Sequence, residues 1–152
     1  MEALGNHYRQ NYGLFVCGLR VAIVYGPGRT TGSTAFAGEL IEKPALGQPV
    51  KVSGGNALVG LVYLDDVVGQ WLTLLDSDKG RFKHYFYNSG SDSLKVYEMA
   101  QIVKKIIPEA QIDVQCGNEK YANGLITKVS DLALEKELGF KRQYKPIEKG
   151  IE

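Results

Sequence analysis

Hydrophobic and polar residues follow two spacings along this chain, one helical and one typical of strands. Apolar side chains recur at helical spacing in segments that predict helices, at residues 1–12, 33–42, 66–75, 93–107 and 131–138. Short apolar or β-branched runs predict strands, at residues 14–25, 50–52, 58–64, 84–88 and 112–114. Because predicted helices and strands alternate along the sequence, the pattern predicts an α/β fold.

The longest strand candidate is the segment Leu14–Tyr25, which is apolar almost throughout. Strands that are buried on both faces of a parallel sheet have this composition. The segment ends at Gly26-Pro27-Gly28, and this combination of glycine and proline breaks regular structure. We therefore expect one long buried strand that ends in a tight turn.

Two acidic residues, Asp65 and Asp66, stand at the start of the predicted helix at residues 66–75. A pair of carboxylates could form an acid/base site. Acidic residues are also favoured at helix N-termini, where they cap free N–H groups and complement the helix dipole. We favour the capping role for both residues. Trp71 lies on the inner stripe of the same helix, and we expect it in the core.

The amino-acid composition does not favour a strongly charged binding partner. Lys and Arg number 18 against 17 Asp and Glu, for a formal net charge of +1, and the nine Tyr are scattered rather than set among basic residues. This balance argues against binding to nucleic acid or to an anionic membrane. No apolar stretch approaches the roughly 20 residues that cross a bilayer, and no signal peptide is recognisable. We expect a cytoplasmic protein.

The residues that most often bind metals are few and isolated. Cys17 and Cys116 lie far apart and outside any CxxC motif, and Cys17 sits in an apolar run where a buried, reduced thiol is expected. His7 and His84 have no partner at the spacing of metal ligands. The sequence therefore predicts no metal site.

Five segments resemble, in order and over nearly the whole chain, motifs from the second half of extended short-chain dehydrogenases/reductases, the NAD-dependent epimerase/dehydratase family. They are Tyr12-Gly13-Leu14 with Val24-Tyr25-Gly26-Pro27-Gly28-Arg29, then Pro49-Val50-Lys51-Val52, Val62-Tyr63-Leu64-Asp65-Asp66-Val67, Tyr87-Asn88-Ser89-Gly90-Ser91, and Ser130-Asp131 with Leu138-Gly139-Phe140. The resemblance implies edge strands of a Rossmann-type parallel sheet, at residues 15–25 and 83–88, and a small substrate-binding α/β subdomain.

Two motifs of this family are missing from the sequence. No GxGxxG or GxxGxxG stretch occurs to bind a dinucleotide pyrophosphate, and no YxxxK pair occurs to transfer a proton. In the resemblance the catalytic Lys would lie just upstream of Met1. We therefore expect residues 1–152 to be a single partial domain without its dinucleotide-binding part. It would have no catalytic residue and bind no cofactor alone, while the complete parent enzyme would use NAD or NADP.

The resemblance also suggests which residues lie near the ligands of a complete enzyme. On the nicotinamide side it places Val21, Ala22 and Val24. On the substrate side it places Ile23, Arg29, Thr31, Val52 and Ser53. For the segment 21–24 the alternative is that these residues are ordinary sheet core, which requires no cofactor.

Two departures from the family pattern bear on the substrate. Ile23 stands where nucleotide-sugar enzymes commonly have an Asn that binds the substrate. The phosphate-binding Arg of the family would fall near Val59, and no Arg occurs between Arg29 and Arg81. Guanidinium groups usually hold diphosphates. Lys51 or Lys120 could replace it, although both are also ordinary surface lysines. We therefore expect a smaller or less anionic substrate.

Two functions remain open from the sequence. The first is a substrate-binding fragment of an NAD(P)-dependent sugar epimerase, dehydratase or dehydrogenase, inactive alone. The second is a free-standing, non-catalytic module that binds a small molecule or assembles with itself. In either case the apolar surface of the first helix or of the long strand is expected to support a homo-oligomer.

Overall fold

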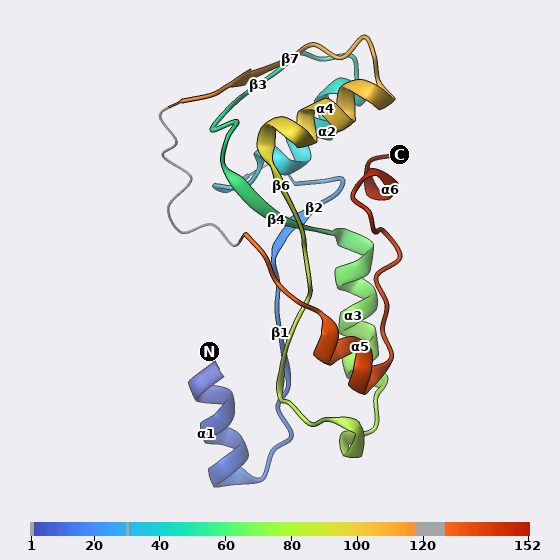
Figure 1. Cartoon of the computed structure of the whole chain (residues 1–152). Helices are drawn as coiled ribbons and strands as arrows, with labels where there is room; N and C mark the ends of the chain where they lie inside the picture. The colour runs from blue at the N-terminus through green and yellow to red at the C-terminus, as the bar shows by residue number, and fades with distance from the viewer. Residues whose placement is uncertain (1, 30, 118–126) are drawn as a thin grey trace.

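The computed structural model describes residues 2–29, 31–117 and 127–152 and has the α/β architecture that the sequence predicts (Figure 1). In chain order the elements are α1 (Glu2–Tyr12), β1 (Gly18–Arg20), β2 (Ile23–Tyr25), α2 (Phe36–Ala45), β3 (Val50–Ser53), β4 (Leu58–Tyr63), α3 (Leu64–Asp76), a 3-10 turn (Lys79–Arg81), β5 (Phe86–Asn88), β6 (Asp92–Lys95), α4 (Val96–Ile106), β7 (Ile112–Gln115), α5 (Leu132–Leu138) and α6 (Glu148–Ile151). None of the helices in these ranges is long and apolar enough to span a membrane.

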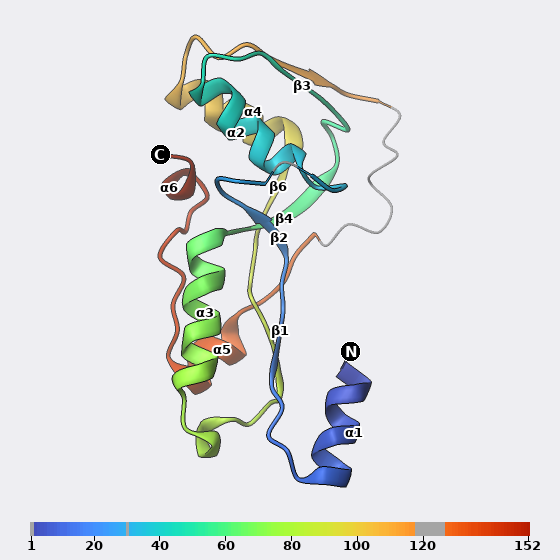
Figure 2. The same cartoon turned by 180° about the vertical axis from the view of Figure 1, so that it is seen from behind.

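A parallel pair of strands, β1 and β5, forms the lower part of the molecule. Gly18 lies opposite Phe86 and Arg20 opposite Asn88. Helices α3 and α5 lie on one side of this pair and α1 on the other (Figures 1 and 2). The lower part therefore has three layers, with helices on both faces of a parallel pair, as parallel strands generally require.

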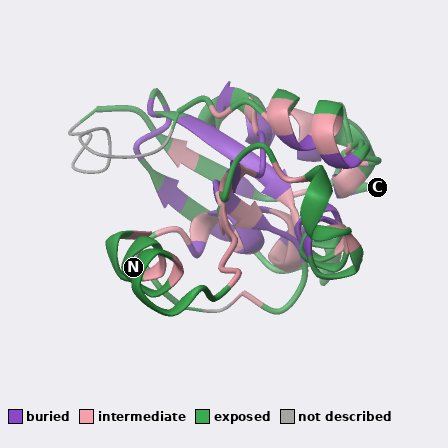
Figure 3. Ribbon diagram, turned by 90° about the horizontal axis from the view of Figure 1, so that it is seen from below, coloured by how far each residue is buried: buried purple, intermediate pink, exposed green. Residues whose placement is uncertain are grey.

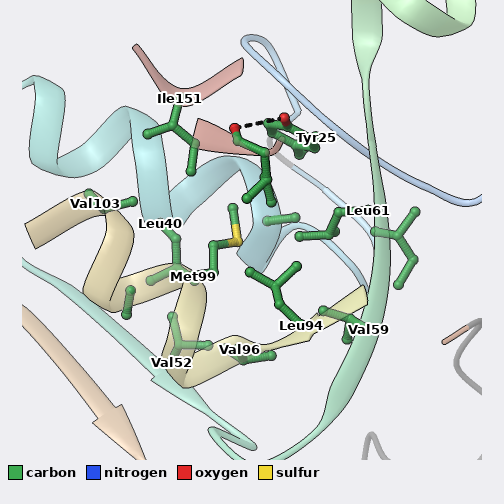
Figure 4. Packing of buried hydrophobic residues seen from close by; sticks show 14 of the residues in the cluster. Tyr25, Leu40, Val52, Val59, Leu61, Leu94, Val96, Met99, Val103 and Ile151 are labelled. Carbon is green, nitrogen blue, oxygen red and sulfur yellow. Dashed lines mark hydrogen bonds between the residues drawn. The ribbon is translucent and has the colours of Figure 1, made fainter. Parts of the chain in front are cut away.

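The upper part contains the main hydrophobic core. Strand β4 pairs in parallel with β2 and in antiparallel with β6, while β3 and β7 form a separate parallel pair. Helices α2 and α4 pack against each other and against these strands. Fully buried side chains such as Leu40, Leu61 and Met99 meet between them (Figure 4). Val59 and Leu61 of strand β4 belong to this core. Because successive side chains of a strand point to opposite faces, Val62 lies on the other face, in a smaller cluster with Ala22.

The prediction of one long strand at residues 14–25 is wrong, because the run forms two short strands in different sheets. Strand β1 pairs with β5, whereas β2 pairs with β4. At the break the Ala22 N–H donates to Ser89 Oγ at 3.0 Å, and the Ser89 N–H donates to the Arg20 carbonyl at 3.1 Å. Ser89 therefore satisfies the backbone where the run leaves one sheet and enters the other.

The helix predicted at residues 93–107 begins later, because residues 92–95 are strand β6. The open edge of β4 accepts these residues as an antiparallel partner, with Leu94 opposite Val59. Helix α4 then starts at Val96, and the Lys95 N–H donates to the Glu98 carboxylate at 2.6 Å. Pairing with a strand far away in the sequence outweighs the local helical pattern.

Asp66 and Trp71 also differ from the prediction. Asp66 is 2% exposed and makes no capping bond to α3. Its two oxygens accept the backbone N–H groups of Gln143 at 2.7 Å and Tyr144 at 3.2 Å. Trp71 is 40% exposed rather than in the core. Cys17, expected to be buried, is only half-buried. Asp66 therefore fixes the C-terminal segment instead of capping its own helix.

Candidate functional site

The turn after β2 is held in place from two sides. At Gly26 φ is 140°, and an added Cβ would lie 3.0 Å from the Leu64 Cβ, so the position requires glycine. The Gly28 N–H donates to a Glu42 carboxylate oxygen on α2. Arg29 Nη1 donates to the Val24 carbonyl at 3.3 Å. The turn forms a shallow hollow of about 300 Å³, lined by Val24, Tyr25, Gly26, Pro27, Gly28, Arg29 and Leu64.

A second hollow of about 220 Å³ lies between the start of α2, strand β3 and the start of α4. Its lining residues are Gly32, Ser33, Ala35, Phe36, Glu39, Lys51, Val52, Ser53, Gly54, Ala57 and Val96. The apolar members include the half-buried ring of Phe36 and the buried Ala57 and Val96. We call this site the α2–β3 hollow. Sites for small molecules are commonly mostly apolar, with a few polar groups that orient the ligand.

Among the described residues, the polar side chains that line the α2–β3 hollow are two hydroxyls and two opposite charges. The hydroxyls belong to Ser33 and Ser53 and the charges to Glu39 and Lys51. Both charged groups have partners, since Lys43 Nζ lies 2.8 Å from a Glu39 oxygen and Lys51 Nζ lies 3.5 Å from an Asp113 oxygen. No Arg is among the lining residues. The described lining therefore offers hydrogen bonds and the Lys51 ammonium, but no guanidinium for a diphosphate.

The structure distributes the predicted substrate residues over three environments. Val52 and Ser53 line the α2–β3 hollow, and Arg29 lines the hollow at the turn. Thr31 is exposed and lies next in sequence to Gly32, which lines the α2–β3 hollow. Ile23 is 7% exposed and belongs to the main core. Lys120 lies outside the described residues.

The three residues predicted on the nicotinamide side lie together at the junction of β1 and β2. Ala22 is 7% exposed and clusters with Val62 and Val67. Val21 and Val24 are half-buried and pack against this cluster. Part of both valine side chains is therefore free to form an apolar wall.

Tyr25 lies beneath the turn but is not available as an acid. It is 1% exposed, and its hydroxyl donates to the Ile147 carbonyl at 3.1 Å (Figure 4). Burial, and then the nearby carboxylates of Asp92 and Asp66, raise the pKa of Tyr25 far above its ordinary value. Its hydroxyl therefore stays protonated and anchors the C-terminal segment.

Sequence reasoning missed most of the lining of the α2–β3 hollow. Ser33, Phe36 and Glu39 were assigned only to a helix, with no role in a site. The sequence feature that could have indicated this hollow is the Gly54-Gly55 turn after β3, which places the chain next to the start of α4. There the Tyr97 N–H donates to the Gly55 carbonyl at 2.9 Å.

Among the described ranges, no group of three or more His, Cys, Asp or Glu side chains is arranged to bind a metal ion.

Comparison with known protein families identifies the chain over more than half of its length. The model described as the NAD dependent epimerase/dehydratase family matches residues 1–90, which include α1, the turn after β2 and the α2–β3 hollow up to Ala57. The chain belongs to the NAD-dependent epimerase/dehydratase family. This match agrees with the motifs that the sequence shares with extended short-chain dehydrogenases/reductases.

Solved structures share the fold over 99% of the chain. A GalE-like L-threonine dehydrogenase from Cupriavidus necator in its holo form is 19% identical, with a TM-score of 0.83, and the match covers 51% of it. The L-threonine dehydrogenase of Phytophthora infestans is 18% identical, with a TM-score of 0.85 and 50% coverage. The Thermus thermophilus UDP-glucose 4-epimerase in complex with NAD is 23% identical, with a TM-score of 0.81 and 48% coverage.

The chain thus spans about half the length of the solved structures that it matches. At these identities the likeness concerns the fold alone. No curated protein matches the chain.

Proposed function

We propose that residues 1–152 form the substrate-binding part of an NAD(P)-dependent sugar epimerase, dehydratase or dehydrogenase, and that this part is inactive alone. The observation that carries the proposal is the α2–β3 hollow, which lies near the Gly26-Pro27-Gly28 turn. The chain that forms both belongs to the NAD-dependent epimerase/dehydratase family. The glycine-rich loop and the YxxxK pair that complete such an enzyme do not occur in the sequence. Hydride transfer would therefore require a dinucleotide-binding part. A cytoplasmic location stays a prediction from composition.

The chemistry of the α2–β3 hollow supports a small, neutral, sugar-like ligand. The Phe36 ring and the apolar floor suit the face of a sugar ring, and the hydroxyls of Ser33 and Ser53 suit its hydroxyl groups. At about 220 Å³ the hollow is smaller than the range of about 300–1,000 Å³ that is usual for whole drug-sized ligands. Together with the absence of Arg from the lining, this favours a substrate without a diphosphate.

The nicotinamide of a bound NAD or NADP would lie against the wall formed by Val21 and Val24. Their half-buried side chains fit an apolar ring, but they provide no donor for the pyrophosphate. The cofactor would supply the hydride acceptor, and these valines would keep water away from the reacting face. The Thermus enzyme bound to NAD supports NAD as the cofactor of the complete enzyme.

Ligand-observed NMR on the purified chain tests the proposal. Glucose and UDP-glucose are the probes, with Phe36→Ala and Ser53→Ala as site variants and Ser130→Ala as the matched control away from the hollow. We expect weak glucose binding that both site variants reduce and the control retains, and no binding of added NAD. Tight NAD binding, alcohol oxidation by the chain alone, or glucose binding that neither site variant reduces would contradict the proposal.

One observation favours the second function, a self-assembling module. Helix α1 has no buried residue (Figure 3). It leaves Leu4, Tyr8 and Tyr12 exposed at spacings of four. The helix is held by a bidentate ion pair between Glu2 and Arg20, at 2.6 and 2.7 Å. We propose that two copies associate through this stripe. In sedimentation velocity over a concentration series, Tyr8→Glu should convert an oligomer to a monomer, and a monomeric wild type would rule the oligomer out.

A further inference from the structure

The chain has two histidines, and the structure holds their rings in opposite ways. His84, between the 3-10 turn and β5, places Nδ1 2.6 Å from a Glu137 carboxylate oxygen. An ionised carboxylate only accepts hydrogen bonds, so the neutral His84 ring carries its proton on Nδ1 and its lone pair on Nε2. His7 Nδ1 lies 3.1 Å from the side-chain nitrogen of Asn11, which only donates. The lone pair of the neutral His7 ring is therefore engaged at Nδ1.

The Glu137 carboxylate that orients His84 is itself fixed. Its side chain is 8% exposed, whereas that of His84 is 59% exposed. The second carboxylate oxygen accepts the Tyr87 hydroxyl at 2.5 Å and the Lys83 N–H at 3.1 Å. Among the described residues, no group forms a hydrogen bond with His84 Nε2. The buried carboxylate thus holds one ring nitrogen and leaves the lone pair of the other open to solvent.

A carboxylate–histidine pair with a free Nε2 can serve as a nucleophile. The carboxylate fixes the tautomer and stabilises the positive charge that the ring gains when Nε2 attacks an electrophile. The surrounding charges favour an anionic electrophile, because Arg81 Nη2 donates to the Glu137 carbonyl at 3.2 Å and Lys83, next to His84 in the chain, is exposed. Guanidinium and ammonium groups are common partners of phosphoryl oxygens.

We propose that His84 Nε2 accepts a phosphoryl group from a small donor with a labile P–N or acyl-phosphate bond. The Nε2 lone pair forms the new N–P bond, while the bond from phosphorus to the leaving group breaks and its electron pair departs with the amine or carboxylate. The proton stays on Nδ1, and the Glu137 carboxylate balances the positive charge of the phosphorylated ring. This site lies in the lower part of the molecule, beside β5 and α5, whereas α2 and β3 lie in the upper part (Figure 1). It is therefore separate from the α2–β3 hollow and independent of the proposed function.

Labelling of the full chain with phosphoramidate tests the acceptor. Intact mass spectrometry should show one acid-labile phosphoryl group per chain, and peptide mapping should place it on His84. His84→Gln should abolish this labelling, whereas His7→Gln is the matched control and should leave it unchanged. Both positions are exposed, so both variants should fold as the wild type does, which circular dichroism checks.

Glu137→Gln tests the part played by the carboxylate, since the amide can donate to His84 Nδ1 and stabilise the tautomer with the proton on Nε2. Labelling should slow roughly 10–100-fold. Long-range ¹H–¹⁵N NMR spectra at mildly alkaline pH, where imidazole rings are neutral, should show the Nδ1–H form of His84 in the wild type and the Nε2–H form in the variant. A purely structural contact would change stability without changing the tautomer.

Four results would overturn the inference. They are no acid-labile phosphoryl group on His84, equal labelling of His7, the Nε2–H form of His84 in the wild type, and an undiminished labelling rate in folded Glu137→Gln. The first three are measured without Glu137→Gln, so the inference stays testable even where that variant unfolds.

Discussion

Glu137 joins helix α5 to the segment before β5, and replacing it by Gln should destabilise the protein. Its side chain is only 8% exposed. One carboxylate oxygen lies 2.6 Å from His84 Nδ1, and the other accepts the Tyr87 hydroxyl at 2.5 Å and the Lys83 N–H at 3.1 Å. Three donors therefore converge on one nearly buried carboxylate.

The amide of Gln can replace only part of this arrangement. It offers a single acceptor oxygen, and its NH₂ group must face at least one of the former donors. Hydrogen bonds to charged groups contribute about 1.5–3 kcal/mol each, and the loss of one sets the expected cost of Glu137→Gln at about 2 kcal/mol. For a chain of this length that corresponds to a fall in Tm of roughly 4–8 °C.

The matched control is Glu135→Gln on the same helix. Glu135 lies 3.5 Å from Lys141, and the two side chains are 39% and 78% exposed. Exposed ion pairs contribute about 0.2–1 kcal/mol, so this change should lower Tm by no more than roughly 1–4 °C. Thermal unfolding by circular dichroism at pH 7 compares the two variants. Equal losses would refute the reasoning that the converging donors stabilise the fold.

The environment of Glu137 also predicts that the stability of the protein depends on pH. Burial alone would raise the pKa of Glu137, but the hydrogen bonds from Tyr87, His84 and the Lys83 N–H outweigh it and hold the pKa below the ordinary value of 4.5. A lowered carboxyl pKa gives stability that is present above pH 4.5 and lost as pH falls through the folded-state pKa. The difference in the free energy of unfolding between the wild type and Glu137→Gln should therefore become smaller in acid. A gap that stays constant down to about pH 3 would contradict this account.

Three further predictions concern other parts of the molecule. The Arg142 side chain is 3% exposed and bridges the half-buried carboxylates of Asp131 and Asp92 at 2.9 and 3.2 Å, so Arg142→Met should cost about 3 kcal/mol in urea unfolding by leaving both carboxylates unpaired. Met99 is fully buried in the main core, so Met99→Ala should cost about 2–5 kcal/mol, against less than about 1 for Ile106→Ala at a position 37% exposed. Burial raises the pKa of the Cys17 thiol, whereas Cys116 is exposed, so Cys116 should react first with Ellman's reagent at pH 8. An Arg142→Met variant as stable as the wild type, equal losses of stability for Met99→Ala and Ile106→Ala, or faster labelling of Cys17 would each refute the corresponding prediction.

Much of the α2–β3 hollow could not be predicted from the sequence. The family resemblance placed Val52 and Ser53 on the substrate side of a complete enzyme, and in the structure both line the α2–β3 hollow. Their contact with a substrate stays a prediction. Phe36 and Glu39 reach it only because α2 packs on β3, an arrangement set by core contacts rather than by local pattern. The pairing of Glu137 with His84 and Tyr87 is equally invisible along the chain, since about 50 residues separate the partners.

Local patterns in the chain were enough to establish the α/β class, the order of most helices and strands, and the membership in the epimerase/dehydratase family. Hydrophobic spacing and turn residues act over a few positions, so they are readable without a structure. Three-dimensional packing was needed to learn that residues 14–25 serve two sheets, that residues 92–95 form a strand, and that Asp66 binds the C-terminal segment. Strand pairing and the burial of a carboxylate depend on partners distant in the sequence, and their free energies outweigh local preference.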